Sequence, residues 1–190
     1  MFIANICSVI LLILVALTFL TQQRSKQQTA ASKIATWFNE RDDGVGQCIV
    51  SNRNDFPVYN IFTFIIPNNF KSKNVKRIFA HVIKNQDDLY LNQQLLEKNE
   101  CNDPEQVGVG IEQMNREANF KTLVYFENLP PGDKDFLFDN NYSSGHGHGV
   151  PGIFFTDNQN IEWLRFSDGS LHRKKYIKTA TKLAVLFSHV

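Results

Sequence analysis

The sequence predicts a mainly β protein in which an N-terminal transmembrane helix is followed by an antiparallel β-sandwich or a small barrel. Residues 1–20 contain no charged side chain and are almost all apolar, and about 20 such residues at about 1.5 Å each span a ~30 Å hydrocarbon core. The chain also has sixteen Phe, and short apolar runs separated by Gly, Pro and Asn, which suit half-buried strands. These runs do not alternate with long helical patterns, which favours antiparallel sheets.

We expect the apolar run to be retained as a transmembrane anchor over residues 1–21. A secretory signal has cationic residues before its apolar core and a small-residue cleavage site after it, and neither pattern surrounds this run. Cys7 follows Ile6, whereas a lipid-attachment cysteine follows a small residue. We therefore interpret Cys7 as an apolar side chain that faces lipid.

The charges that flank the anchor predict its orientation, because Lys and Arg next to a span stay on the cytoplasmic side. No Lys or Arg precedes the run, and Arg24, Lys26, Lys33 and Arg41 follow it. The sequence therefore predicts a single-pass protein of the cell membrane with its N-terminus outside and its C-terminal domain in the cytoplasm.

Cysteine content agrees with this orientation, because Cys48 and Cys101 are the only cysteines after the anchor and small secreted domains usually carry a denser framework. If the domain were exported, these two residues could form a disulfide. An exported, anchored envelope domain therefore stays an alternative.

A juxtamembrane segment, residues 22–43, is expected to be helical or a linker. Ile34, Trp37 and Phe38 stand at helical spacing, and we expect them to pack on the sheet that follows. Alternatively, the helix bends along the membrane surface and brings Trp37 and Phe38 to the interface.

Residues 44–173 are expected to form the sandwich. Turn-forming residues bound the expected strands, which are residues 48–52, 57–66, 75–83, 122–126, 136–138, 152–156 and 161–166. Residues 157–160 are expected to be the turn of a hairpin. Residues 87–120 fit neither period and are read as a short helix or a long loop.

The C-terminal tail, residues 174–190, is cationic first and apolar last. Such a segment could lie on the inner leaflet, held there by Leu183, Leu186 and Phe187. A closing strand or helix packed on the domain is the alternative.

Three groups of residues carry a family resemblance. They are an Asn-rich turn before Pro57-Val58-Tyr59 in residues 51–61, Leu129-Pro130-Pro131-Gly132-Asp133, and Phe155-Thr156-Asp157 with Trp163, Arg165 and residues 168–171. In these pieces the chain resembles uncharacterised bacterial single-pass membrane proteins whose soluble part is an immunoglobulin-like β-sandwich. The resemblance implies an immunoglobulin-like fold and a membrane topology. It implies no activity.

One loop has residues that could bind a metal. His146 and His148 alternate with glycines in residues 145–149, and two imidazoles in a flexible frame can ligate a borderline divalent ion. Two ligands do not complete a site, and the glycines also suit a plain connection between strands. We expect no metal and no cofactor, and keep a metal-dependent membrane enzyme that uses this loop as an alternative.

No catalytic motif is recognised elsewhere. The sequence Gly108-Val109-Gly110 lacks the Gly-Lys-Ser/Thr of a phosphate-binding loop, and no serine stands in a nucleophile elbow. Residues Asp133 to Asp135 are better explained as a charged corner than as paired acid and base. The sequence therefore predicts a protein that is not an enzyme.

Trp163 and Arg165 are the candidate interaction residues. They share one face of an expected strand, and both residue types are enriched among interface anchors. We favour a second reading, in which Trp163 is the core aromatic of the sandwich and Arg165 is its neighbour on the same face.

Charge excludes one class of partner, because a formal net charge of +1 does not suit a globally basic nucleic-acid binder. The function that the sequence favours is a membrane-tethered binding or scaffold module with an unknown protein partner. The lipid bilayer is its other expected contact, since tethering concentrates the domain at the membrane.

Overall fold

The computed structural model describes residues 2–40, 45–85, 122–139 and 149–183. Residues 75–85 are helical, and this helix precedes β4. The other elements are α1 (Phe2–Ser32), β1 (Ile34–Glu40), β2 (Val45–Asn52), β3 (Val58–Pro67), β4 (Leu123–Leu129), β5 (Gly132–Asp139), β6 (Gly149–Thr156), β7 (Glu162–Phe166), β8 (Leu171–Arg173) and α4 (Ile177–Lys182).

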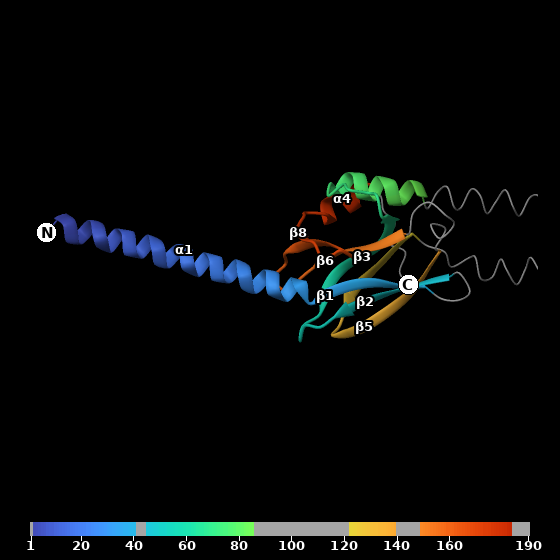
Figure 1. Cartoon of the computed structure of the whole chain (residues 1–190), viewed down its shortest axis with the longest axis horizontal. Helices are drawn as coiled ribbons and strands as arrows, with labels where there is room; N and C mark the ends of the chain where they lie inside the picture. The colour runs from blue at the N-terminus through green and yellow to red at the C-terminus, as the bar shows by residue number, and fades with distance from the viewer. Residues whose placement is uncertain (1, 41–44, 86–121, 140–148, 184–190) are drawn as a thin grey trace, which may run out of the picture.

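The strands form two sheets in which every paired strand is antiparallel. One sheet has three strands in the order β1-β2-β5, and the other has five in the order β4-β3-β6-β7-β8. The helix of residues 75–85 and α4 cover the five-stranded sheet on the side away from the smaller sheet, which makes a third layer (Figure 1). The expectation of a mainly β domain with antiparallel sheets behind an apolar N-terminal helix is confirmed.

Helix α1 extends away from the domain (Figure 1). Its segment Ser8–Ser32 contains a window long and apolar enough to cross a membrane, and no part of that window is buried in the protein. The large apolar side chains from Val9 to Leu20 are all more than half exposed. An apolar window that is not buried against its own chain is what a membrane span requires, so α1 is a candidate span.

The five-stranded sheet is buried on both faces. Residues 61–66 of β3 and 151–156 of β6 are all buried, so these two strands read as continuous apolar runs and not as alternating patterns. One face packs against the smaller sheet through Ile61, Ile153 and Trp163. The other face packs under the helical layer through a cluster that includes Phe62 and Phe154.

The first strand differs from the expectation for the juxtamembrane segment. The helix ends at Ser32, and residues Ile34–Glu40 are strand β1. The buried residues of β1 are Ile34 and Thr36, whereas Trp37 is exposed, which is the period of a strand. The helical spacing of three aromatic and aliphatic residues was therefore misleading, because pairing of β1 with β2 along its whole length decides the conformation.

Residues 75–85 correct a second expectation, that of a strand over residues 75–83. Val75, Ile78, Phe79 and Val82 are buried, and this spacing is the stripe of an amphipathic helix. Asn74 begins the helix, because its side-chain oxygen accepts a hydrogen bond from the backbone N–H of Arg77 at 3.3 Å, as N-cap residues do. The alternation of apolar and polar residues over 77–82 was the weaker signal.

The predicted hairpin is confirmed as β6 and β7. The carboxylate of Asp157 accepts hydrogen bonds from the backbone N–H groups of Gln159 and Ile161, each at 2.9 Å. Asn160 takes a positive φ of 60° in this turn, which Asn tolerates better than most residues.

The described part of the tail packs on the domain. Strand β8 (Leu171–Arg173) immediately precedes the tail, and within the tail Ile177–Lys182 are helix α4, while Leu186 and Phe187 lie outside the described residues. Tyr176 is buried, and its hydroxyl donates to the carbonyl oxygen of Asn60 at 2.6 Å and lies 2.9 Å from Oγ1 of Thr156. Tyr176 therefore joins the tail to strands β3 and β6.

Candidate functional site at the junction of helix and domain

Arg165 on β7 joins the end of helix α1 to the sandwich. One nitrogen of its guanidinium, Nη1, donates to the carbonyl oxygens of Ser32 and Ile34, the second at 2.6 Å. The last carbonyls of a helix lack partners within the helix, and a cation is favourable at this end of the helix dipole. Arg165 therefore both caps the helix and stabilises the start of β1.

Partial burial lowers the pKa of Arg165, because the charged guanidinium loses water there. The ordinary pKa of arginine is so high that the side chain stays charged at neutral pH. The hydrogen bonds at Ser32 and Ile34 are therefore charge-assisted, which makes them stronger than neutral ones.

Trp163 lies in the core between the two sheets, with 3% of its surface exposed. Its indole Nε1 donates to Oδ2 of Asp157 at 2.8 Å. The guanidinium of Arg173 lies 5.2 Å from the centre of the indole ring, within the range of a cation–π contact. Trp163 is thus a core aromatic, as the favoured reading of the sequence expects, and its ring is not presented on an exposed strip with Arg165.

Gln27 of α1 makes the second connection to the domain. Its Nε2 donates to Oε1 of Gln159 at 2.7 Å, and its Oε1 accepts from Nη2 of Arg173. Gln159 belongs to the turn between β6 and β7, and Arg173 belongs to β8. Helix α1 is therefore connected to the domain at three points, through β7, the hairpin turn and β8.

These contacts border a cleft of about 430 Å³, which we name the junction cleft. It is lined by Arg24 and Gln28 of α1 and by Trp163, Leu171, His172, Arg173 and Lys174 of the domain. Three of these residues are Arg or Lys, and none is Asp or Glu. The junction cleft is thus a cationic hollow with an aromatic wall, which suits an anionic ligand.

A second hollow, of about 410 Å³, lies beside the hairpin turn. Its lining includes Tyr59, Asn60, Tyr125, Glu127 and Asp157. Several of its polar groups already have partners: the hydroxyl of Tyr125 donates to Oδ1 of Asn60 at 3.3 Å, and Asp157 accepts from the turn and from the indole. This hollow is therefore better explained by the packing of the hairpin turn than by ligand binding.

The metal alternative depends on residues that the structure does not describe. His146 and His148 both lie outside the described residues. Within residues 2–40, 45–85, 122–139 and 149–183, no three His, Cys, Asp or Glu side chains come together in a way that could hold a metal ion.

The junction residues Gln27, Gln28, Arg173 and Lys174 were not recognised as a site in the sequence. They are polar or basic residues separated by about 145 positions, with no spacing that relates the two groups. Arg24 carried a signal of another kind, since it belongs to the positive residues that follow the apolar run.

Comparison of the chain with protein-family models, with curated proteins and with solved structures found no match.

Proposed function

We propose that this protein is a membrane-tethered, non-catalytic binding module, with α1 as its single span and the sandwich on the cytoplasmic side. The observation that carries the proposal is the direct connection of α1 to the domain, since Arg165 and Gln27 both hold the end of the helix on the sandwich. A flexible linker would leave the domain free to rotate. A held helix instead keeps one end of the domain toward the membrane.

The length of α1 supports a short stalk. If the apolar run that ends at Leu20 fills the hydrocarbon core, the remaining residues 21–32 of α1 extend about 18 Å beyond it at about 1.5 Å per residue. The headgroup layer occupies about 5–8 Å of that distance. The domain then stands close enough to the membrane for its charges to interact with anionic lipid.

The cytoplasmic side is supported by the positive residues of the stalk. Arg24, Lys26 and Lys33 follow the apolar run, and no acidic residue lies before Glu40, a bias typical of cytoplasmic flanks. Cys48 is a free thiol in the core, and free thiols suit a reducing compartment. Cys101, its partner in the exported alternative, lies outside the described residues.

The strand order supports an immunoglobulin-like assignment of the sandwich. Strands β1-β2-β5 pair in the order A-B-E of such domains, and β3-β6-β7 pair in the order C-F-G. In this correspondence β4 is an added edge strand beside C, β8 is one beside G, and the helix of residues 75–85 lies in the connection between β3 and β4. Immunoglobulin-like domains act widely as binding modules, which agrees with the proposal.

The side of the membrane is tested with a thiol placed at an exposed position. Ser167, in the turn between β7 and β8, is exposed, so Ser167→Cys in a Cys101→Ser background gives an accessible reporter. We expect a membrane-impermeant maleimide to label it only after the cells are opened. The Cys101→Ser protein without the new thiol is the matched control, because Cys48 is buried.

Anchoring is tested separately by alkaline extraction of the membranes, which releases proteins that lack a span. We expect the full chain to stay in the pellet. Labelling of Ser167→Cys on intact cells would overturn the cytoplasmic assignment, and release by alkali would overturn the anchor itself.

A further inference from the structure

We propose that the junction cleft binds the phosphate-bearing headgroup of an anionic phospholipid from the leaflet that faces the domain. The inference rests on the proposed function in one respect, since it needs α1 to be the membrane anchor. It adds the chemical class of a ligand and the residues that would hold it.

The position of the cleft along α1 suits a headgroup. Arg24 lies four residues beyond Leu20, where the apolar run ends, which is about 6 Å at about 1.5 Å per residue. A bilayer of about 40–45 Å with a hydrocarbon core of about 30 Å has its headgroups at that height. The lining residue closest to the span is thus placed at the level of lipid phosphates, and Gln28 lies one turn further from the membrane.

The donors in the cleft suit a phosphate. Arg24, Arg173 and Lys174 line it, and arginine offers a planar fork that matches two phosphate oxygens. Arg173 is already oriented, because it donates to Gln27 and lies over the indole of Trp163. Its guanidinium has further N–H groups for a ligand, so little ordering is needed when the ligand binds.

Glu162, whose backbone carbonyl oxygen accepts a hydrogen bond from the backbone N–H of Lys174 at 3.0 Å, uses its carboxylate elsewhere. Oε2 of Glu162 accepts hydrogen bonds from the backbone N–H groups of Tyr176 and Ile177, at 2.6 and 2.9 Å. Glu162 therefore serves the start of α4, and it is not among the residues that line the cleft.

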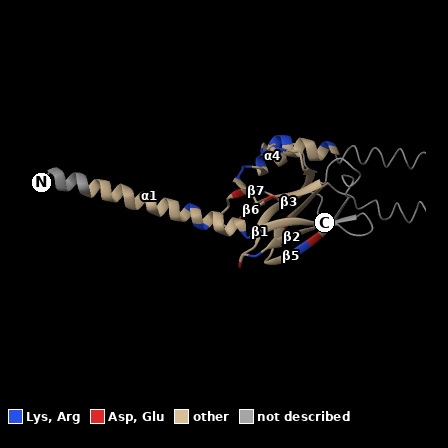
Figure 2. Ribbon diagram, viewed as in Figure 1, with Lys and Arg blue, Asp and Glu red and all other residues tan. Residues whose placement is uncertain are grey.

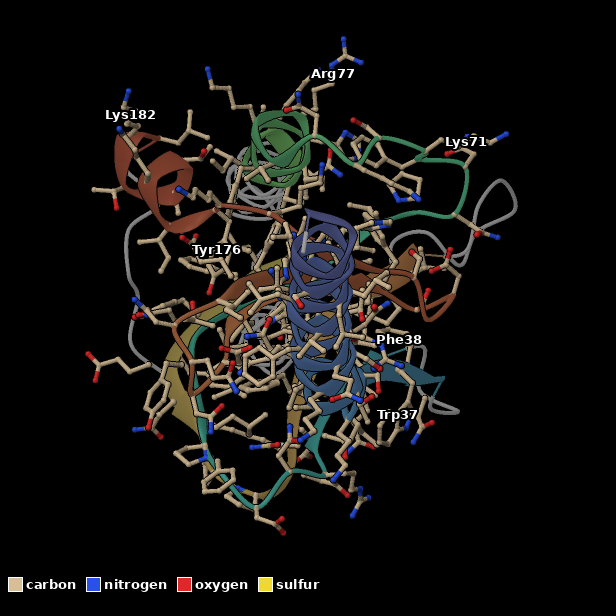
Figure 3. All side chains as sticks on the ribbon, turned by 90° about the vertical axis from the view of Figure 1, so that its left-hand side faces the viewer. Trp37, Phe38, Lys71, Arg77, Tyr176 and Lys182 are labelled. Carbon is tan, nitrogen blue, oxygen red and sulfur yellow. The ribbon has the colours of Figure 1, made fainter. Side chains whose placement is uncertain are left out.

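The segments that form the helical layer over the five-stranded sheet are basic as well. Residues 68–85 and residues 169–183 each contain five Lys or Arg and no Asp or Glu. Figure 2 shows these charges gathered around α4, with further basic residues on α1. Viewed along α1 from its N-terminal end, Lys71, Arg77 and Lys182 lie at the rim of the face that the membrane would meet (Figure 3). Such a rim attracts anionic lipid toward the cleft.

Retention of single lipids on the full-length protein tests the inference. Native mass spectrometry in detergent micelles that contain equal amounts of phosphatidylserine and phosphatidylcholine with matched acyl chains measures which lipid stays bound. We expect the wild-type chain to retain phosphatidylserine preferentially. The double variant Arg24→Gln/Lys174→Gln should lose that preference by about tenfold, because two charge-assisted contacts are removed.

Two controls separate the cleft from general charge. Arg53→Gln/Lys134→Gln removes two positive charges that lie outside the cleft lining, and it should leave the preference unchanged. Lys174→Arg keeps the charge and should retain the lipid.

Inorganic phosphate provides the competing arm. Inorganic phosphate and a soluble headgroup without acyl chains are each added at millimolar concentration. If phosphate displaces the bound lipid to the same extent as the soluble headgroup, the cleft is a site for soluble anions and the lipid inference is wrong. Equal retention of the two lipids by the wild-type chain would also overturn it.

These outcomes are distinguishable from failure of the proposed function. The micelle assay does not depend on which side of the membrane the domain occupies, whereas thiol labelling and alkaline extraction do not depend on lipid preference. A protein that is anchored with a cytoplasmic domain but binds both lipids equally loses only the inference about the cleft.

Discussion

The sulfur of Cys48 lies 3.2 Å from Oγ1 of Thr36 in the core between the two sheets. Both side chains are buried, and this burial raises the pKa of the Cys48 thiol to about 12. A thiol is reactive only as the thiolate. Cys48 therefore does not react with thiol reagents while the domain is folded, whichever side of the membrane the domain occupies.

The same burial predicts a loss of stability at alkaline pH. The unfolded thiol ionises near its ordinary pKa of 9.0, whereas the folded thiol ionises near 12, so above pH 9 the unfolded chain binds fewer protons than the folded one. The contribution of Cys48 is complete below pH 9 and falls by up to about 1.4 kcal/mol per pH unit above it. Urea denaturation of the full chain under reducing conditions at pH 8, 9, 10 and 11 measures the effect.

The matched control for this experiment is Cys48→Ala. Its free energy of unfolding should start lower at pH 8, and the difference from the wild type should shrink as the pH rises. Tyr176, whose pKa burial also raises, is present in both proteins and cancels in the difference. A constant difference from pH 8 to 11 would show that Cys48 does not ionise on unfolding.

Replacing Arg165 by Met should loosen the junction. The carbonyls of Ser32 and Ile34 lose their charged donor, and a hydrogen bond to a charged group contributes about 1.5–3 kcal/mol. We expect a lower free energy of unfolding and faster cleavage by trypsin after Lys33, which is exposed at the junction. Arg53→Met is the control, since its ion pair with Asp133 is largely exposed and such pairs contribute about 0–1 kcal/mol.

Replacing Trp163 by Ala should lower the free energy of unfolding by about 3–5 kcal/mol, as for other buried aromatics. Trp163→Phe keeps most of the ring but leaves Oδ2 of Asp157 without the indole donor, which costs about 1–3 kcal/mol. Trp37→Ala, at an exposed position of β1, should change stability little. Thermal denaturation of the three full-length variants measures the order, and equal melting of the two alanine variants would exclude a core role for Trp163.

Gly152 on β6 should not tolerate a larger residue. A Cβ at this position would lie 2.5 Å from the ring of Phe64, and that ring is held against Phe154, with 5.2 Å between the ring centres. Gly152→Ala should therefore cost about 1–3 kcal/mol through overpacking. Adding Phe64→Leu should recover part of the loss, because the smaller side chain leaves room for the methyl group. Strictly additive effects in the double variant would show that the two residues do not interact.

The sequence predicted the elements whose residues carry their own signal. Residues 58–67 form a strand because they are a long β-branched and aromatic run that ends in turn formers, and the β6–β7 hairpin follows from its turn residues. Helix α1 follows from its apolar length. The helix of residues 75–85 has an equally local signal in the helical spacing of its apolar residues and in the N-cap residue Asn74. The shorter alternation of apolar and polar residues over 77–82 led to the wrong prediction of a strand.

Other features depend on contacts between distant parts of the chain. Residues 34–40 have side chains that fit either period, and they are a strand because β2 offers a partner along their whole length. Trp163 and Arg165 share a face in any strand. In the structure this face is directed toward the smaller sheet and the end of α1, so Trp163 fills the core and Arg165 binds the end of the helix.

The sequence by itself therefore determined an apolar N-terminal helix, a β-rich domain and most strand positions, because hydrophobic length, periodicity and turn chemistry are local properties. Only the tertiary structure decided how the two sheets pack against each other, which face of β7 is internal and how α1 contacts the domain. It also brings Arg24 and Gln28 to Arg173 and Lys174 across about 145 residues. No local pattern records that approach, since it results from the packing of the whole sandwich against the last turns of one helix.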